Sequence, residues 1–107
     1  MICIKYTLID NKITYLETSG HANYDEYGKD IVCAGVSAII VGLNNALDEL
    51  NENVDIKVKG NNFVFKNNSN STKVNDYFKL AIKQLETIQE TYGKYVRIER
   101  NAQWNLY

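Results

Sequence analysis

The sequence has very few of the residues that build metal centres and disulfides. Its 107 residues include one histidine, two cysteines and no proline. A structural zinc ion usually needs four cysteine or histidine ligands, so one histidine without a close cysteine pair argues against a metal site. In a chain without an export signal, the two cysteines are expected to be free thiols rather than a disulfide. We therefore expect no metal and no other cofactor.

Net charge is also nearly absent, since 12 Lys and Arg residues stand against 13 Asp and Glu residues. Such a chain has no extended positive field for a nucleic-acid backbone, so direct nucleic-acid binding is not expected. We find no apolar run that is long enough for a signal peptide or a membrane span, and the charged Lys5 interrupts the first apolar residues. We expect a cytoplasmic protein that does not bind a membrane, folded as a single domain over residues 1–107.

Hydrophobic periodicity predicts both the secondary structure and the fold class. Alternating apolar and polar residues indicate strands at 1–9, 13–19, 54–59, 63–65 and 95–100, and helical spacing indicates helices at 31–50 and 74–92. The turn residues between the first two strands indicate an antiparallel hairpin. The order ββαββαβ predicts an α+β fold of two layers, with two helices packed on a mostly antiparallel five-stranded sheet.

A sheet that carries helices on one face leaves its other face open. The sequence shows no obvious polar protection along that face, so we expect a homodimer to cover it. The last residues include Trp104 and Tyr107, which are expected to pack on the surface or on a partner.

The most informative stretch is 20–37, where a polar loop leads into the first helix. It contains the single histidine, His21, and one of the two cysteines, Cys33. Asp30 directly precedes the apolar run, where a carboxylate can accept hydrogen bonds from the free amides of the first helical turn. Cys33 then lies where those amides and the helix dipole favour a thiolate. His21 lies at the end of a strand and can fold back toward the sulfur, which would give a nucleophile and its base.

These residues also have other possible roles. A lone cysteine on a helix is more often a small buried apolar residue, and spacing alone does not decide for catalysis. Cys3 is not a candidate nucleophile, because it falls on the polar face of a strand away from any helix start. Asp30 can cap the helix, orient His21 or do both, although its charge opposes a thiolate. Ser37 follows Cys33 by one turn, where its hydroxyl can face the substrate region or bond back to the preceding carbonyl.

The same stretch resembles the signature of the ribosomal-processing cysteine protease family. That signature pairs a Gly-His-Ala opening with an Asp-Ile-Val-Cys stretch, followed by a small residue and Val-Ser. The matching residues are Gly20-His21-Ala22, Gly28, Asp30-Ile31-Val32-Cys33 and Val36-Ser37. Asp25 and Gly35 depart from the pattern, in which alanine is common at both positions. Length and element order also fit, so the resemblance covers essentially the whole chain.

The resemblance implies a cysteine endopeptidase in which Cys33 is the nucleophile and His21 donates and accepts protons. Gly20, Asp30 and Ser37 are then supporting residues, and amides at the start of the helix are candidates for the oxyanion hole. The resemblance further implies a homodimer and one substrate, the precursor of large-subunit ribosomal protein L-twenty-seven. Such enzymes remove a short N-terminal extension from this precursor.

Two other functions fit the same residues. In a non-catalytic ribosome-assembly interaction module, Cys33 would be a core residue and the loop a docking surface. In a redox-sensing thiol protein, Cys33 would need a resolving cysteine, and only Cys3 could supply it. We rank the protease first and the redox protein last.

Overall fold

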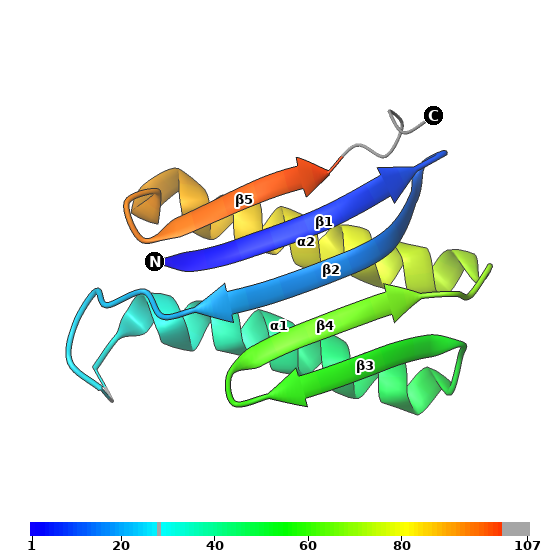
Figure 1. The fold of residues 1–107 in the computed structure, drawn as a ribbon, viewed down its shortest axis with the longest axis horizontal. Coiled ribbons are helices and arrows are strands. Elements are labelled where there is room, and N and C mark those ends of the chain that lie inside the picture. The colour runs from blue at the N-terminus through cyan, green and yellow to red at the C-terminus, as the bar shows by residue number, and fades with distance from the viewer. Residues whose placement is uncertain (28, 102–107) are drawn as a thin grey trace.

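Two helices lie over one face of a five-stranded sheet in the computed structural model, which describes residues 1–27 and 29–101 (Figure 1). In chain order the elements are β1 (Ile2–Ile9), β2 (Lys12–Gly20), α1 (Ile31–Leu50), β3 (Val54–Lys59), β4 (Asn62–Asn67), α2 (Thr72–Tyr92) and β5 (Val96–Asn101). This order confirms the predicted two-layer α+β fold. The tail that contains Trp104 and Tyr107 lies outside the described residues.

The strands are arranged in the order β3-β4-β2-β1-β5. Three neighbouring pairs are antiparallel, whereas β1 and β5 run parallel, with Ile2 opposite Val96. The sheet is therefore mostly antiparallel, as predicted. Between β1 and β2, Asp10 and Asn11 have φ angles of 49° and 65°, which is the conformation of the tight hairpin turn that the sequence indicated.

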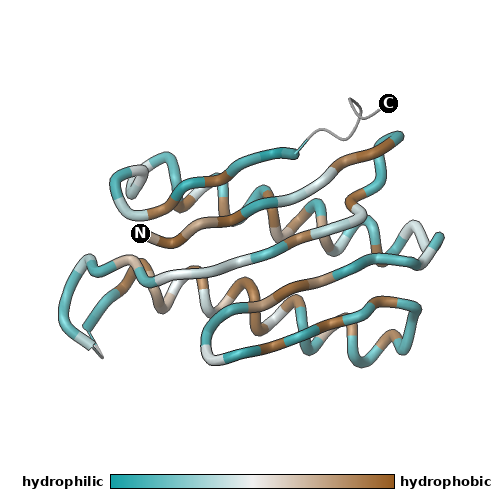
Figure 2. Tube along the Cα trace, in the orientation of Figure 1, coloured by the Kyte–Doolittle hydropathy of each residue, from teal (hydrophilic) through white to brown (hydrophobic). Residues whose placement is uncertain are grey.

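The hydrophobic core lies between the sheet and the helices. Phe65 of β4 and Phe78 of α2 are fully buried, and their rings meet edge to face with 5.9 Å between the centroids. Ile4 of β1 and Leu16 of β2 are likewise fully buried. Apolar residues alternate with polar ones along the strands and recur along both helices (Figure 2). The core thus follows the two periodicities that predicted these elements.

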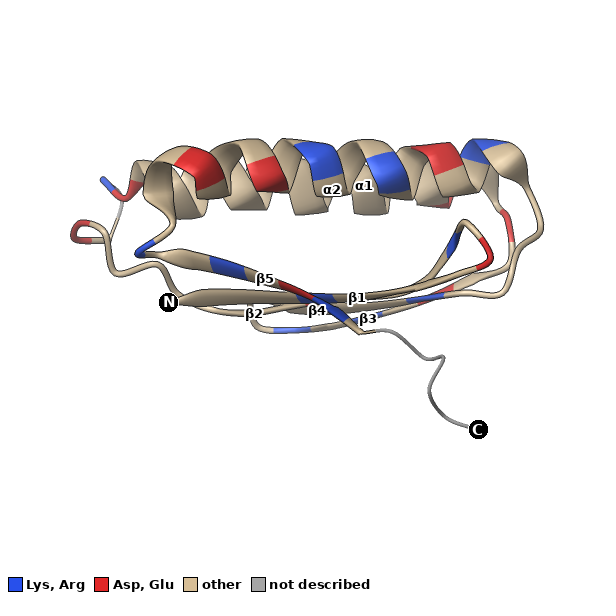
Figure 3. Ribbon diagram, turned by 90° about the horizontal axis from the view of Figure 1, so that it is seen from above, with Lys and Arg blue, Asp and Glu red and all other residues tan. Residues whose placement is uncertain are grey.

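The open face of the sheet carries charged residues, contrary to the expectation that it lacks polar protection. Residues opposite each other on neighbouring strands share a face, and the register aligns one row across all five strands. From β3 to β5 this row reads Lys57, Val64, Glu17, Lys5 and Glu99. Figure 3 shows both signs of charge along the strands. The expected lack of polar protection is therefore wrong, because the charges alternate with core residues along each strand. The homodimer itself stays a prediction.

Helix α1 corrects the expectation that no apolar run is long enough to span a membrane. By length and composition its 20 residues pass that test. In the fold, however, α1 lies beside α2, and it contributes five buried residues to the core that it shares with the strands. These residues are Val32, Val36, Ile40, Leu43 and Leu47. The core therefore accounts for one side of the apolar run, whereas Ile31 and Val41 on the rest of the helix are exposed.

Candidate active site

The loop between β2 and α1 meets the start of α1 at a hollow of ≈ 670 Å³, which we call the site hollow. All five residues that the sequence singled out line it: Gly20, His21, Asp30, Cys33 and Ser37. The turn between β3 and β4 forms another part of its wall, through Gly60 and Asn61. The fold therefore brings the predicted site residues together, and it adds a segment from a distant part of the chain.

Asp30 is the N-cap of α1. Its Oδ1 accepts hydrogen bonds from the backbone amides of Val32 at 3.0 Å and Cys33 at 2.9 Å, and its Oδ2 accepts one from the Tyr24 amide at 3.0 Å. Partial burial raises the pKa of Asp30, but the amides of Cys33 and Tyr24 outweigh this and hold the pKa below its usual value. Of the roles left open by the sequence, the structure shows the helix cap. The second oxygen holds the loop rather than His21.

We expect Asp30→Ala to lower the free energy of unfolding at neutral pH by about 1 kcal/mol, the usual cost of losing a cap. Asp30→Asn keeps an oxygen acceptor and should lose less. Because folding lowers the pKa, the carboxylate contributes fully above its usual value of 3.8, and this contribution is lost as the pH falls through the lower folded value. Urea unfolding at neutral pH and at about pH 3 measures the change. Equal stability of Asp30→Ala and wild type at neutral pH would contradict the cap.

Cys33 lies half-buried in the first turn of α1. Its Sγ accepts a hydrogen bond from the backbone amide of Ala22 at 3.4 Å, and Ala22 itself is only 3% exposed. This contact fixes the residue next to His21 against the start of the helix.

The candidates for the oxyanion hole need correction. Asp30 accepts the amides of Val32 and Cys33 with its side chain, and it accepts the Ala34 amide with its backbone oxygen at 3.0 Å. The helix-start amides expected for this task are therefore occupied by the cap. The Ala22 amide is instead the backbone donor that points at the sulfur.

His21 directly follows β2 and is exposed to solvent. Asn61 of the β3–β4 turn and Asn62 at the start of β4 hold the strand end before it. Asn62 Oδ1 accepts from the Gly20 amide at 3.4 Å, and Asn61 Nδ2 donates to the Gly20 carbonyl oxygen at 3.4 Å. Asn61 Nδ2 also lies 3.3 Å from both ring nitrogens of His21. The sequence reasoning missed Asn61, because 40 positions separate it from His21 and only its turn composition was recognisable.

Gly20 serves the site through its backbone. Its φ angle is +87°, and a Cβ at this position would lie 2.4 Å from the backbone oxygen of Met1. Only glycine avoids both the left-handed strain and this clash. The absence of a side chain therefore lets β2 end beside the start of β1 and release the loop toward α1.

Tyr24 anchors the loop at a second place. Its ring packs edge to face on Tyr92, at the end of α2, and on Tyr95, just before β5, with centroid separations of 5.5 and 5.1 Å. Because its amide also donates to Asp30, Tyr24 links the loop to the cap of α1 and to the far helix. The sequence reasoning missed this residue as well. Its apolar partners lie far along the chain, so no local pattern indicated them.

Ser37 belongs to the wall of the site hollow, whereas Cys3, which the sequence excluded as the nucleophile, does not. Ser37 lines the site hollow one turn beyond Cys33 and is exposed, so its hydroxyl lies in the region open to a substrate. Cys3 lies half-buried in β1, and its cross-strand neighbour Arg97 is paired with Glu99 at 3.3 Å. Cys3 is not part of the wall of the site hollow that the described residues form.

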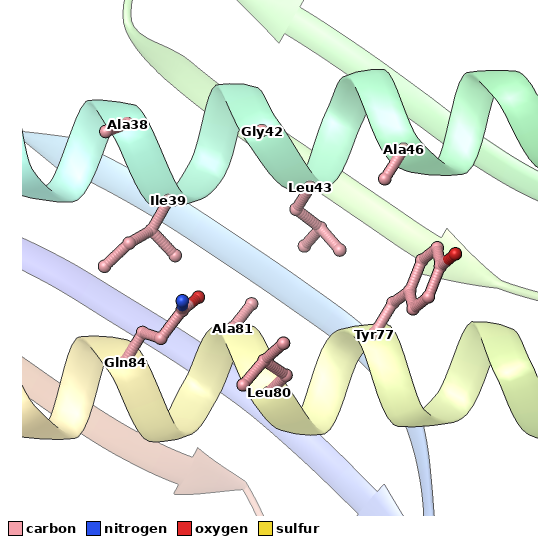
Figure 4. Close-up of a pocket in the computed structure, with 9 residues that line it drawn as sticks. All are labelled: Ala38, Ile39, Gly42, Leu43, Ala46, Tyr77, Leu80, Ala81 and Gln84. Carbon is pink, nitrogen blue, oxygen red and sulfur yellow. The ribbon is translucent and has the colours of Figure 1, made fainter.

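A second hollow, of ≈ 390 Å³, lies between α1 and α2. Figure 4 shows its lining, which is Ala38, Ile39, Gly42, Leu43, Ala46, Tyr77, Leu80, Ala81 and Gln84. These side chains include no acid, base or thiol. The reactive groups lie in the site hollow instead, which is therefore the candidate active site.

Known proteins resemble this chain along most of its length. The model of a family described as cysteine protease Prp matches residues 1–97. The ribosomal processing cysteine protease Prp of Staphylococcus aureus (strain NCTC 8325 / PS 47) is 38% identical over 104 residues, which are 92% of this chain and 97% of the relative. The protein of the same name from Bacillus subtilis (strain 168) is 35% identical over 100 residues, covering 86% of this chain and 89% of the relative.

The fold is similar to a solved structure as well. The crystal structure of the essential ribosomal processing protease Prp from S. aureus, in complex with a covalently linked product peptide, superimposes with a TM-score of 0.89. The two chains are 34% identical, and the match covers 94% of this chain and 100% of the other. A second S. aureus Prp structure, in complex with a substrate peptide, gives a TM-score of 0.82 at 32% identity, over 94% of this chain and 100% of the other.

Proposed function

This chain belongs to the cysteine protease Prp family, and we propose that it removes the N-terminal extension from the precursor of ribosomal protein L-twenty-seven. The predicted cysteine protease class is confirmed by this membership. One observation carries the assignment of the site: Cys33 and His21 line one hollow at the start of α1, and a backbone amide points at the sulfur there. The relatives named for ribosomal processing support the kind of substrate.

The proposed reaction begins with Cys33 and His21. The thiol proton passes to the His21 ring, and the sulfur forms a bond to the carbonyl carbon of the scissile peptide. The carbonyl oxygen takes up the negative charge, and the Ala22 amide, 3.4 Å from Sγ in the resting site, is the proposed donor to it. When the C–N bond breaks, His21 protonates the leaving amine, and a thioester remains on Cys33.

Water completes the reaction. His21 removes a proton from a water molecule, whose oxygen attacks the thioester carbon. The carbonyl oxygen again carries the charge, and collapse of this intermediate releases the new carboxyl end of the peptide and returns the thiol. In the resting structure the ring contacts Asn61 and the sulfur contacts Ala22, so substrate binding has to bring His21 and Cys33 together.

The direct test is to incubate the protein with the L-twenty-seven precursor and measure the mass of the product. We expect one cut, with loss of the short N-terminal extension as one piece. The matched control is the mature protein without the extension, which should keep its mass. An unchanged precursor mass after incubation with the folded protein would contradict the proposed substrate.

The same proposal includes a cellular setting. Ribosomal proteins are made and assembled in the bacterial cytoplasm, and we therefore keep the cytoplasmic location as part of the proposal. The homodimer implied by the family resemblance is proposed with it. The rival role as a non-catalytic assembly module has less support, because a docking surface does not require a thiol and an imidazole in one hollow.

A further inference from the structure

The β3–β4 turn approaches the imidazole of His21 from across the site hollow. Asn61 lies at the tip of this turn, directly after Gly60, whose φ of +63° reverses the chain. Its Nδ2 lies 3.3 Å from Nδ1 and 3.3 Å from Nε2 of His21, and 3.4 Å from the Gly20 carbonyl oxygen. One amide group therefore reaches both the backbone before the histidine and the ring itself.

The chemistry of these contacts fixes the orientation of the amide. The Gly20 carbonyl oxygen can only accept, so the nitrogen of the Asn61 amide must face it. One N–H serves that oxygen, and the second is free to donate to the ring. Because Nδ2 lies 3.3 Å from each ring nitrogen, it contacts the imidazole without selecting one of the two nitrogens, and it holds the ring against the turn.

We propose that Asn61 is a positioning residue for His21, which holds the imidazole in one orientation beside the site hollow. This inference rests on the proposed function, because it assigns His21 a proton-transfer role. A nucleophile and base commonly have a third group that orients the base. Among the described residues, Asp30 makes no hydrogen bond to His21: its carboxylate accepts the Val32, Cys33 and Tyr24 amides instead.

The next residue along the chain, at the start of β4, supplies the matched control. Asn62 has the same side chain and also holds the end of β2, through the Gly20 amide at 3.4 Å, but the His21 contacts belong to Asn61. A residue that only tethers the strand end would therefore behave like Asn62. A residue that positions the ring would affect His21 in ways that Asn62 does not.

His21 is the single histidine of the chain, so its ring signals in a ¹⁵N-labelled sample have one source. The ¹H and ¹⁵N chemical shifts of the ring report its surroundings. We expect the same ring shifts in the wild type and in Asn62→Ala, and in Asn61→Ala shifts that move toward those of a free histidine side chain.

Kinetics on the precursor form the second arm. Asn61→Ala should lower kcat on the order of ten-fold or more, because a misplaced base loses reaction geometry, with a smaller change in KM. Asn61→Gln keeps the amide and should recover part of kcat. Far-UV circular dichroism of each variant confirms that the fold is kept, and the ring spectra need no activity.

The outcomes separate this inference from the proposed function. Ring spectra and kcat of Asn61→Ala that match the wild type would overturn the positioning role, and so would changes that Asn62→Ala reproduces in full. If His21→Ala still cleaved the precursor, the proposed mechanism would fail instead. The ring spectra would still decide whether Asn61 orders the imidazole.

Discussion

Replacing Cys33 by serine should abolish cleavage of the L-twenty-seven precursor and leave a folded protein that still binds it. A hydroxyl is far less acidic than a thiol, so the same surroundings do not turn a serine at this position into an alkoxide nucleophile. We expect kcat to fall by about 10⁴-fold or more, as for loss of the nucleophile in other proteases. Product mass and initial rates measure this loss.

The chain offers a direct control for Cys33→Ser. Cys3 has the same side chain and the same half-buried class, but it lies in β1 outside the hollow. Cys3→Ser should therefore cleave at close to the wild-type rate. Wild-type cleavage by folded Cys33→Ser would refute the nucleophile. Equal losses in both variants would indicate a general effect of removing a thiol rather than a loss of chemistry.

The second large effect is expected from His21→Ala, which should lower kcat to a similar extent. Its reason differs, because this change removes the group that protonates the leaving amine and later activates water. His21 is exposed, so the free energy of unfolding should change by less than about 0.5 kcal/mol. Initial rates on the precursor, with urea unfolding as a check of stability, measure both quantities.

The double variant sharpens this test. Residues that act as one unit lose most of their activity when either is removed, so Cys33→Ser combined with His21→Ala should be scarcely slower than Cys33→Ser alone. Losses that multiply would instead show two independent contributions. If the protein were a non-catalytic assembly module, the wild type itself would not cleave the precursor, and neither single change would alter that result.

The secondary structure was predictable because it depends on local patterns. Leu16 and Phe65 lie on strands with alternating burial, and Val32 and Val36 begin a helical stripe, so period and burial agree with the observed elements. The family signature then gave the protease class. The alternation of apolar and polar residues did not show which charged residues would lie side by side on the open face, such as Lys5 and Glu17. Their alignment depends on the register of the strands.

Parts of the site that depend on distant residues were not predictable. Asn61 reaches His21 only because β4 pairs with β2, and Tyr24 finds Tyr95 only because β5 pairs with β1. Neither pairing has a signature in hydrophobic spacing. The role of Asp30 was also open, because the sequence does not show that the loop would bring the Tyr24 amide to its second oxygen.

The parallel pairing of β1 with β5 also has a consequence for the order of folding. β1 is an inner strand, and its Ile2 faces both Gly20 of β2 and Val96 of β5 while lining the site hollow. The first strand of the chain therefore completes its hydrogen bonds only after the last strand has been synthesised. Such long-range pairing slows folding, and until it forms β1 remains an unpaired edge. We therefore expect the hollow around Cys33 to take its final shape only after β5 has left the ribosome.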